Sequence, residues 1–295
     1  MLTLEDLAAL VEQHRPTLNS RVCEFEIGGR PFRFNARSHL MGVVNLSPDS
    51  WYRESVCLTT EQAIRRGKTL HAQGADIVDI GAESTLAHAS RADSTVQTSR
   101  LLPVIEELRA AGVLVSVETY DAGVTRECLK AGANVLNWTG TDEPGRFFEL
   151  AAEHQAAVIV CYVQGRNVRD VGDFDFKGDA ISQMERYFEL QIKAAGKLGL
   201  KKLIIDPGLG FYYRNLQDSA VRVRHQMKVF LNTFRLRTLG FPVCHALPHA
   251  FEYFGEEVRS AEPFFAVLAA LGKTDLFRTH EVPRTKAVLD TLGVY

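Results

Sequence analysis

The chain has 295 residues, of which 46% are hydrophobic and 24% are charged, and its formal net charge is -2. These values are ordinary for a globular protein with a large core, and the small charge argues against a broad basic surface for nucleic acid or acidic lipid. No apolar run reaches the length of a membrane span, so we expect neither a nucleic-acid partner nor a membrane. The N-terminus lacks a signal-peptide pattern and the five cysteines form no CxxC pair, which predicts a reduced, cytoplasmic protein.

The first 38 residues are expected to form an N-terminal extension with a short helix and a β-hairpin around Gly28-Gly29. From 39 to 295, short runs rich in Val, Ile and Leu alternate with longer segments of helical period. The runs predicted to be strands are 39–46, 75–81, 114–119, 135–139, 157–163, 202–206, 242–246 and 275–280. The main helical patterns between them are 61–73, 96–111, 122–131, 144–154, 180–198 and 217–239.

Glycine follows several of these helical segments, at positions 74, 112, 132, 199, 240 and 272, where it is the expected C-cap. A glycine-capped helix that leads into the next strand is typical of a parallel sheet. Eight such units predict an α/β fold of the (β/α)8 TIM-barrel type, with a doubly wound open sheet as the alternative. The least regular segments are a polar insertion at 164–178 and a stretch rich in His and aromatics at 247–257.

Polar residues stand where the predicted strands end, which is where a (β/α)8 barrel builds its active site. They include Asn45, Asp79, Glu83, Glu118, Asn137, Tyr162, Gln164, Asp206, His245, His249, Arg278, His280 and Glu281. Burying a polar group without a partner costs about 1–3 kcal/mol, so a core selected only for stability would not gather so many around one axis. For any single residue, pairing with loop backbone remains the alternative.

The residue types indicate what this ring binds. The carboxylates of Glu118 and Asp206 can each accept paired N–H bonds from a 2-amino-pyrimidinone edge, and Asn137 can donate and accept, which suits a flat, nitrogen-rich heterocycle. Arg278 and His280 are two apart on a predicted strand, so we expect both on one face, where they suit a phosphate or carboxylate. A surface salt bridge is the alternative for Arg278. Asn45 is a candidate ligand of a metal held partly through water.

Six segments together resemble the dihydropteroate synthase family. They are 41–50 (MGVVNLSPDS), 74–85 (GADIVDIGAEST), 116–120 (SVETY), 131–137 (AGANVLN), 206–211 (DPGLGF) and 278–281 (RTHE). They come in the family order and run from about residue 39 to the C-terminus, so the resemblance covers the whole expected barrel and sets its limits at 39–295.

The resemblance implies a transferase that joins a pterin hydroxymethyl diphosphate to an aromatic amine such as 4-aminobenzoate and releases diphosphate, with Mg²⁺ present. It implies a homodimer, a metal near Asn45 and a catalytic role for Asp206, Arg278 and His280. The residues expected to bind substrate are Glu118, Asn137, Asp206, Phe211, Thr85, His249, Arg278 and His280.

The chain also departs from the family pattern. Glu118 replaces an aspartate, and the extra methylene moves the carboxylate about one bond further into the pocket. Leu86-Ala87-His88 replaces Arg-Pro-Gly, and Tyr212-Tyr213 replaces Gly and then Lys, with Arg214 near enough to substitute in part. Leu247-Pro248-His249 replaces Ser-Arg-Lys, and Trp51-Tyr52-Arg53-Glu54 replaces a glycine-rich turn.

These losses of positive or flexible residues keep other functions open, among them a barrel that acts on a different phosphorylated metabolite through Arg278 and His280. Two further alternatives are more specific. One is a pterin-binding barrel with different, methyltransferase-like chemistry, which needs no diphosphate site. The other is a non-catalytic paralogue, which predicts a pocket filled by Trp51, Tyr213, Phe251 or Tyr253.

Overall fold

Eight parallel strands form the centre of the protein. A computed structural model describes residues 1–295 except 48, 50–51, 53–54, 84–91, 176 and 212. The strands are β3 (His39–Asn45), β4 (Ile77–Gly81), β5 (Leu114–Thr119), β6 (Val135–Trp138), β7 (Ala157–Cys161), β10 (Leu203–Asp206), β11 (Cys244–Ala246) and β12 (Leu276–Thr279). Each lies within a run predicted as a strand, because short apolar runs rich in β-branched residues satisfy a sheet that is covered on both sides.

The strands follow one another around the sheet in chain order. Hydrogen-bonded neighbours run β10-β7-β6-β5-β4-β3-β12-β11. The two ends of this order meet through a parallel bridge between Ile205 and Val243, where the Ile205 amide donates to the carbonyl of Pro242 at 3.0 Å. The sheet is therefore closed into a barrel, which confirms the predicted (β/α)8 fold and excludes the doubly wound open sheet.

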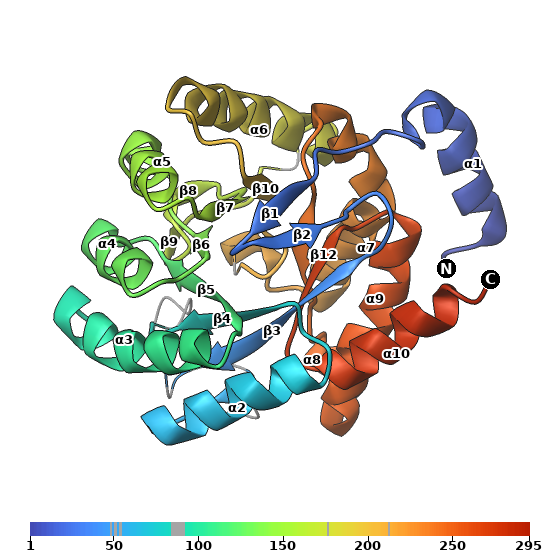
Figure 1. Ribbon diagram of the computed structural model, residues 1–295. Coiled ribbons are helices and arrows are strands. Elements are labelled where there is room, and N and C mark those ends of the chain that lie inside the picture. The colour runs from blue at the N-terminus through green and yellow to red at the C-terminus, as the bar shows by residue number, and fades with distance from the viewer. Residues whose placement is uncertain (48, 50–51, 53–54, 84–91, 176, 212) are drawn as a thin grey trace.

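A helix follows every strand and lies on the outside of the barrel (Figure 1). These helices are α2 (Thr60–Ala72), α3 (Ser94–Ala110), α4 (Ala122–Lys130), α5 (Pro144–Glu153), α6 (Ala180–Lys197), α7 (Ser219–Leu236), α9 (Ala261–Leu271) and α10 (Val282–Leu292). Four of them begin after an aspartate whose side chain accepts an amide hydrogen bond in the first turn, at 2.8–3.1 Å; these residues are Asp93, Asp121, Asp179 and Asp218. The caps satisfy helix amides that have no partner within the helix.

Five of the six glycines expected as C-caps adopt a positive φ, but Gly272 has φ -80°. There the left-handed residue is Lys273, with φ 65°. Gly272 is needed for another reason, because a Cβ at this position would lie 1.7 Å from the carbonyl oxygen of Phe230. The end of α9 therefore packs directly on the backbone of α7.

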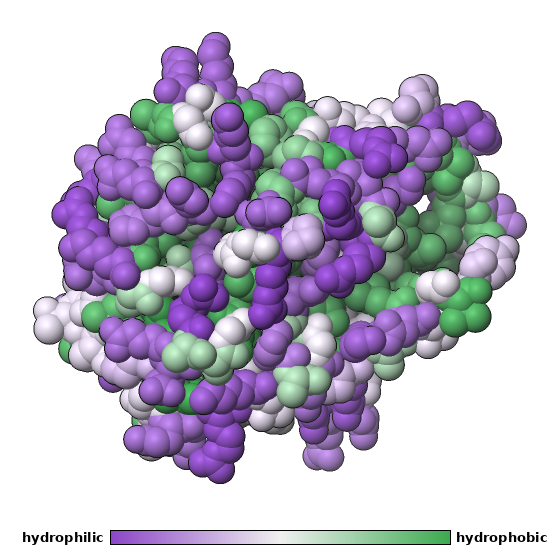
Figure 2. All heavy atoms as spheres, viewed as in Figure 1, coloured by the Kyte–Doolittle hydropathy of each residue, from purple (hydrophilic) through white to green (hydrophobic). Residues whose placement is uncertain are grey.

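The N-terminal residues cover the end of the barrel where the strands begin. After α1 (Leu4–His14) and a 3-10 turn, η1 (Arg15–Thr17), the chain forms a hairpin of β1 (Phe25–Ile27) and β2 (Arg30–Phe32). Ile27 and Phe32 pack in one buried cluster with Met41, Ile77 and Leu114 from the starts of three strands. Figure 1 shows the hairpin across this end, and Figure 2 shows polar side chains over most of the same face with apolar ones gathered beside α1.

The two irregular segments contain elements that the sequence pattern did not predict. The polar insertion holds a small hairpin of β8 (Gly165–Asn167) and β9 (Asp170–Val171). The stretch after β11 holds the short α8 (Phe251–Phe254) and a 3-10 segment, η5 (Gly255–Ser260). Two further 3-10 turns, η3 (Arg214–Leu216) and η4 (Arg237–Leu239), flank α7. Among the described residues, no helix has the length and apolar character needed to cross a bilayer.

Arg237 joins the N-terminal segment to the barrel. Its side chain forms a buried ion pair with Asp275 just before β12, and it donates to the Ser20 carbonyl at 3.3 Å and to Asn35 Oδ1 at 3.2 Å. The other oxygen of Asp275 accepts the Val243 amide at 2.8 Å. One guanidinium therefore satisfies groups from segments far apart in the sequence.

We expect Arg237→Ala to lower the free energy of unfolding by about 3–5 kcal/mol, because it leaves the Asp275 carboxylate buried without its partner. Urea denaturation measures this change. The control is Lys130→Ala, which removes an exposed ion pair with Glu127 and should change stability by about 0.5 kcal/mol or less. An Arg237→Ala protein as stable as the control would contradict this account.

Candidate functional site

One pocket opens at the carboxyl ends of the strands. Its volume is about 200 Å³. Eight of the residues expected to bind substrate or metal line it: Asn45, Glu118, Asn137, Asp206, Phe211, His249, Arg278 and His280. Thr85 and residues 86–88 lie outside the described residues. The ends of five strands thus contribute polar side chains to one cavity, as parallel strands of a barrel can.

Arg278 organises the floor of this pocket. Its Nε donates to Asp79 Oδ2 at 2.8 Å, and its terminal Nη2 forms an ion pair with Glu118 Oε2. Asn137 Nδ2 donates to the same Asp79 oxygen at 3.1 Å. The side chain of Arg278 is 15% exposed and that of Asp79 is 1% exposed, so a surface salt bridge at Arg278 is excluded.

Arg278 and His280 both lie on the pocket side, as expected from the sequence, but in separate settings. β12 ends at Thr279, and the chain leaves strand geometry before His280. Arg278 faces the carboxylates of β4 and β5, whereas His280 Nδ1 pairs with Glu262 Oε1 of α9 at 2.7 Å. Both residues line the pocket, but they are fixed by different partners.

Asp206 is positioned by the turn that follows β10. Its Oδ1 accepts the amide hydrogen of Gly208 at 2.7 Å. Gly208 has φ 73°, and a Cβ there would lie 2.2 Å from the Tyr162 carbonyl oxygen, so the position admits only glycine. Burial raises the pKa of Asp206 to about 6, although the Gly208 amide acts in the opposite direction.

Glu118 has a similar electrostatic setting. Burial raises its pKa to about 6, the Arg278 guanidinium opposes this shift, and the carboxylates of Asp79 and Asp206 add to it. Several carboxylates therefore share one guanidinium at the bottom of the pocket. A ligand that donates hydrogen bonds to them would replace part of the stabilisation that water supplies to carboxylates at a protein surface.

Asn45 and Phe211 line the pocket from different strands, Asn45 at the end of β3 and Phe211 in the loop after β10. Asn45 ends β3, and its Nδ2 donates to Ser55 Oγ at 2.6 Å, which fixes the plane of the amide. Phe211 follows the Gly208 turn, and its amide donates to the Gly208 carbonyl at 3.3 Å. Asn45 offers a polar atom to the pocket and Phe211 an apolar ring.

His249 and His280 stand together at the mouth, with the ring of Tyr52 over both. The Tyr52 ring centroid lies 4.8 Å from that of His249 and 4.7 Å from that of His280. Burial lowers the pKa of His249 to about 4 and that of His280 well below its usual value. Both imidazoles are therefore neutral near pH 7.

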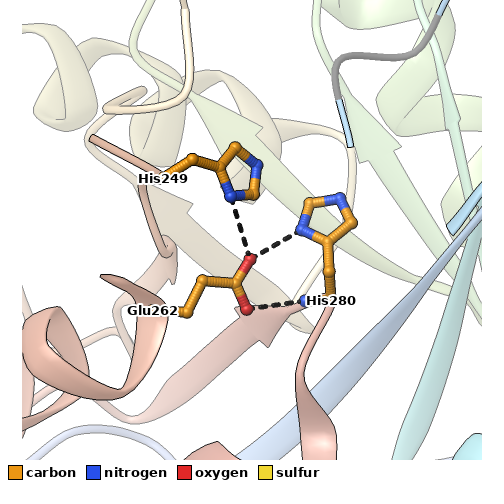
Figure 3. A group of neighbouring side chains, drawn as sticks. All are labelled: His249, Glu262 and His280. Atoms are coloured by element: carbon orange, nitrogen blue, oxygen red, sulfur yellow. Dashed lines mark hydrogen bonds and ion pairs between the residues drawn. The ribbon is translucent and has the colours of Figure 1, made fainter. Parts of the chain in front are cut away.

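Sequence reasoning missed Glu262, which contacts both histidines. Figure 3 shows its carboxylate between the two rings. The helical period carried a signal, because Glu262 shares a buried face of α9 with Phe265, Ala266 and Ala269. A glutamate on such a face requires a polar partner.

Other residues differ from their expected places. His245 faces the helices and pairs with Thr233 Oγ1 at 2.8 Å, so it is outside the pocket. Arg214 is exposed on η3 and does not line the pocket. Arg222 of α7, which the sequence pattern did not single out, does line it, and its terminal nitrogen Nη2 bonds both carboxylate oxygens of Glu252 at 2.7 Å.

The chain is similar in sequence to known pterin-binding enzymes. A profile of the family described as pterin binding enzyme matches residues 41–246. The dihydropteroate synthase of Synechocystis sp. is 29% identical over 272 residues, covering 87% of this chain and 89% of its own. That of Bacillus subtilis is 31% identical over 216 residues, covering 71% of this chain and 70% of its own.

The solved structures give the same result. The Xanthomonas albilineans dihydropteroate synthase with 4-aminobenzoic acid superposes with a TM-score of 0.76 at 29% identity, covering 92% of this chain and 97% of its own. The matched region contains the strands whose ends carry the pocket residues. The chain therefore belongs to the dihydropteroate synthase family of pterin-binding enzymes.

Proposed function

We propose that this chain joins a pterin hydroxymethyl diphosphate to 4-aminobenzoate or a similar aromatic amine and releases diphosphate. The main observation that supports this proposal is that one pocket is lined by Glu118, Asn137, Asp206 and Arg278. It combines acceptors for a nitrogen-rich heterocycle with one buried cation for an anionic group. The relatives named dihydropteroate synthase support the same reaction.

The carboxylates would orient the pterin. An ionised Asp206 accepts two parallel N–H bonds from the 2-amino-pyrimidinone edge. Glu118 lines the same pocket from β5, which β6 and β7 separate from the β10 strand of Asp206. Asn137 already donates a hydrogen bond to Asp79, which fixes the plane of its amide. The Oδ1 atom of Asn137 accepts a hydrogen bond from the Cys161 thiol at 3.6 Å. Holding the heterocycle in one pose aligns its methylene carbon with the incoming amine.

Arg278 would stabilise the departing charge. In the reaction the amine nitrogen forms a bond to the methylene carbon, and the C–O bond breaks with its electron pair passing to the diphosphate oxygen. The nitrogen then loses a proton to water. A preorganised guanidinium in a buried site lowers the energy of the transition state in which negative charge develops on that oxygen.

The residues at the pocket mouth fit Mg²⁺ as the metal of this reaction. Asn45, with its amide plane fixed by Ser55, would supply one neutral oxygen, and the substrate diphosphate and water would supply the others. This donor set suits Mg²⁺, which keeps several waters and is held by few protein ligands. When bound, the ion would neutralise charge on the diphosphate.

We also propose a cytoplasmic homodimer. The five cysteines are all free thiols, which supports a reducing compartment. Phe264, Leu271 and Leu292 on α9 and α10 expose 44%, 55% and 38% of their surface, which supports burial against another chain.

Of the aromatic residues that a non-catalytic paralogue would place in the pocket, the three that the structure describes do not fill it. Tyr213 is buried, and its hydroxyl accepts the Gln164 amide hydrogen at 3.0 Å. Tyr253 is 60% exposed, and Phe251 lines the wall of a cavity that keeps about 200 Å³. Trp51 lies outside the described residues. This volume equals roughly six to seven waters' share of liquid volume, so the site has room for a ligand.

The direct test of the proposed function is calorimetric titration with 6-hydroxymethyl-7,8-dihydropterin diphosphate, with and without Mg²⁺. Addition of 4-aminobenzoate to the complex should then release diphosphate. Binding without release would favour the methyltransferase-like or binding alternative, and no binding would contradict the proposal.

We expect Arg278→Ala to lower kcat for diphosphate release by about 10²–10³-fold, the cost of removing one preorganised stabiliser of transition-state charge. The matched control is Arg146→Ala on α5, where the arginine is 53% exposed and does not line the pocket. Steady-state release assays on both proteins measure the difference. Equal rates would exclude Arg278 from the reaction.

We expect pterin affinity to fall as the pH falls through about 6. Asp206 and Glu118 have pKa values raised to about 6, so they are ionised at neutral pH and protonated below it. A carboxylate one pH unit below its pKa is about one-tenth ionised, so affinity should drop about tenfold between neutral pH and pH 5 for each required carboxylate. Calorimetry with 6-hydroxymethyl-7,8-dihydropterin measures this change. Circular dichroism at each pH checks the fold, and a constant affinity would contradict the assigned roles.

A further inference from the structure

Three side chains of metal-ligating type converge at the pocket mouth from three separate segments. His249 follows β11, Glu262 lies in the first turn of α9, and His280 follows β12. The Nδ1 atoms of both histidines approach the same oxygen, Glu262 Oε1, at 2.7 Å from His280 and 3.6 Å from His249. Figure 3 shows both rings turned toward this carboxylate, and one ligand atom from each residue lies within 4.8 Å of the others.

Neighbouring groups hold Glu262 in place. Its second oxygen, Oε2, accepts hydrogen bonds from the Thr279 hydroxyl, from the His280 amide at 2.8 Å and from the Glu281 amide at 3.1 Å. Three donors thus fix one oxygen and aim the other between the two imidazoles. Partners of this kind orient the first-shell ligands of metal sites.

The charge of the cluster favours a cation. The Glu262 side chain is 0% exposed, and among the described residues its ion-pair partners are His249 and His280 alone. Arg259 pairs with Glu281 at 2.7 Å instead, and Arg66 donates to the backbone carbonyl of His280 at 3.3 Å rather than to Glu262. A carboxylate buried in this way is costly unless it is paired or coordinates a metal.

We propose that His249, Glu262 and His280 bind a divalent transition-metal ion of the Zn²⁺ class. Two imidazole nitrogens and one carboxylate oxygen form the donor set of catalytic zinc and related transition-metal sites. Mg²⁺ prefers an all-oxygen set, so this site is distinct from the one at Asn45.

The ligand atoms already lie near one another, all within 4.8 Å. At zinc–ligand distances of about 2.0–2.1 Å, tetrahedral ligand atoms lie roughly 3.3 Å apart. The two measured separations from Glu262 Oε1 bracket this value. Three protein ligands leave one coordination position open, and His249 and His280 both line the pocket, so that position faces the substrate.

The role of this ion rests on the proposed function. His249 stands where the resemblance places a lysine, and a divalent ion there would restore positive charge to the pocket mouth. Its open position would take an oxygen of the substrate diphosphate. The ion would thus act together with Arg278, which approaches the pocket from the barrel floor.

The test is Zn²⁺ binding by the purified full-length chain after treatment with a chelator. We expect one Zn²⁺ per chain by competitive titration. His249→Ala, His280→Ala and Glu262→Gln should each weaken binding by more than about 100-fold, which exceeds the loss of an outer-shell partner. His154→Ala, which removes an exposed histidine at the end of α5, is the control and should bind as the unchanged chain does.

His249→Ala decides the matter if Glu262→Gln disturbs the fold, because His249 lies in a loop and its side chain is 12% exposed. Circular dichroism checks each variant. Co²⁺ gives a second readout, since its visible absorption bands should appear in the unchanged chain and shift when inorganic diphosphate is added. The proposal would be overturned by absence of stoichiometric Zn²⁺ binding or by an unchanged Zn²⁺ affinity in His249→Ala. Co²⁺ absorption bands that stay the same when diphosphate is added would also overturn it.

These outcomes separate the metal site from the reaction. Zn²⁺ binding that His249→Ala abolishes supports the site even in a chain that releases no diphosphate, which would count against the proposed function alone. Diphosphate release by a chain that binds no Zn²⁺ would overturn the metal site and leave the function intact. Glu262 would then serve to orient His280 through its hydrogen bond.

Discussion

The pocket depends on one constraint, which is that the single guanidinium on its floor must balance several buried carboxylates. Arg278 contacts Asp79 and Glu118 directly, and Asp206 lies close enough for its pKa to depend on Arg278. Buried like charges repel strongly where water is excluded, so the cation fixes where the carboxylates point. The same interaction leaves Glu118 and Asp206 with raised pKa values, and with acceptors that a hydrogen-bonding ligand can satisfy.

This network explains in physical terms why a glutamate can stand at position 118. Its longer side chain brings a carboxylate from β5 to the guanidinium of β12, with which it forms an ion pair. A substrate that takes an N–H bond to Glu118 and places an anion beside Arg278 would exchange this internal pair for two external ones. Because both charges stay paired throughout, the exchange avoids most of the cost of breaking a buried ion pair. The departure from the family residue is therefore compatible with the same reaction.

The sequence predicted the barrel well because its strands are short apolar runs and its helices begin and end with recognisable caps. It also located the strand-end residues, since alternation sends Asn137 into the pocket while Trp138 packs against Phe147 and Phe148 of α5. It could not predict partners that arrive from other elements. The role of Glu262 depends on His249 and His280, which reach it from two other segments. The separate settings of Arg278 and His280 depend on where β12 ends, which periodicity fixes only to within a few residues.

The end of β12 joins the two charged parts of the site. Arg278 faces the carboxylates of the floor, Thr279 and His280 bond to Glu262, and Glu281 accepts hydrogen bonds from Tyr52 and Arg259. Four consecutive residues thus connect the heterocycle pocket, the histidine cluster and the first loop. A movement of this segment that changes one set of contacts also moves the others, because the four residues share one short stretch of backbone. The floor of the pocket and the histidine cluster therefore stand on one short stretch of backbone, so a ligand that displaces Arg278 also displaces the segment that carries His280.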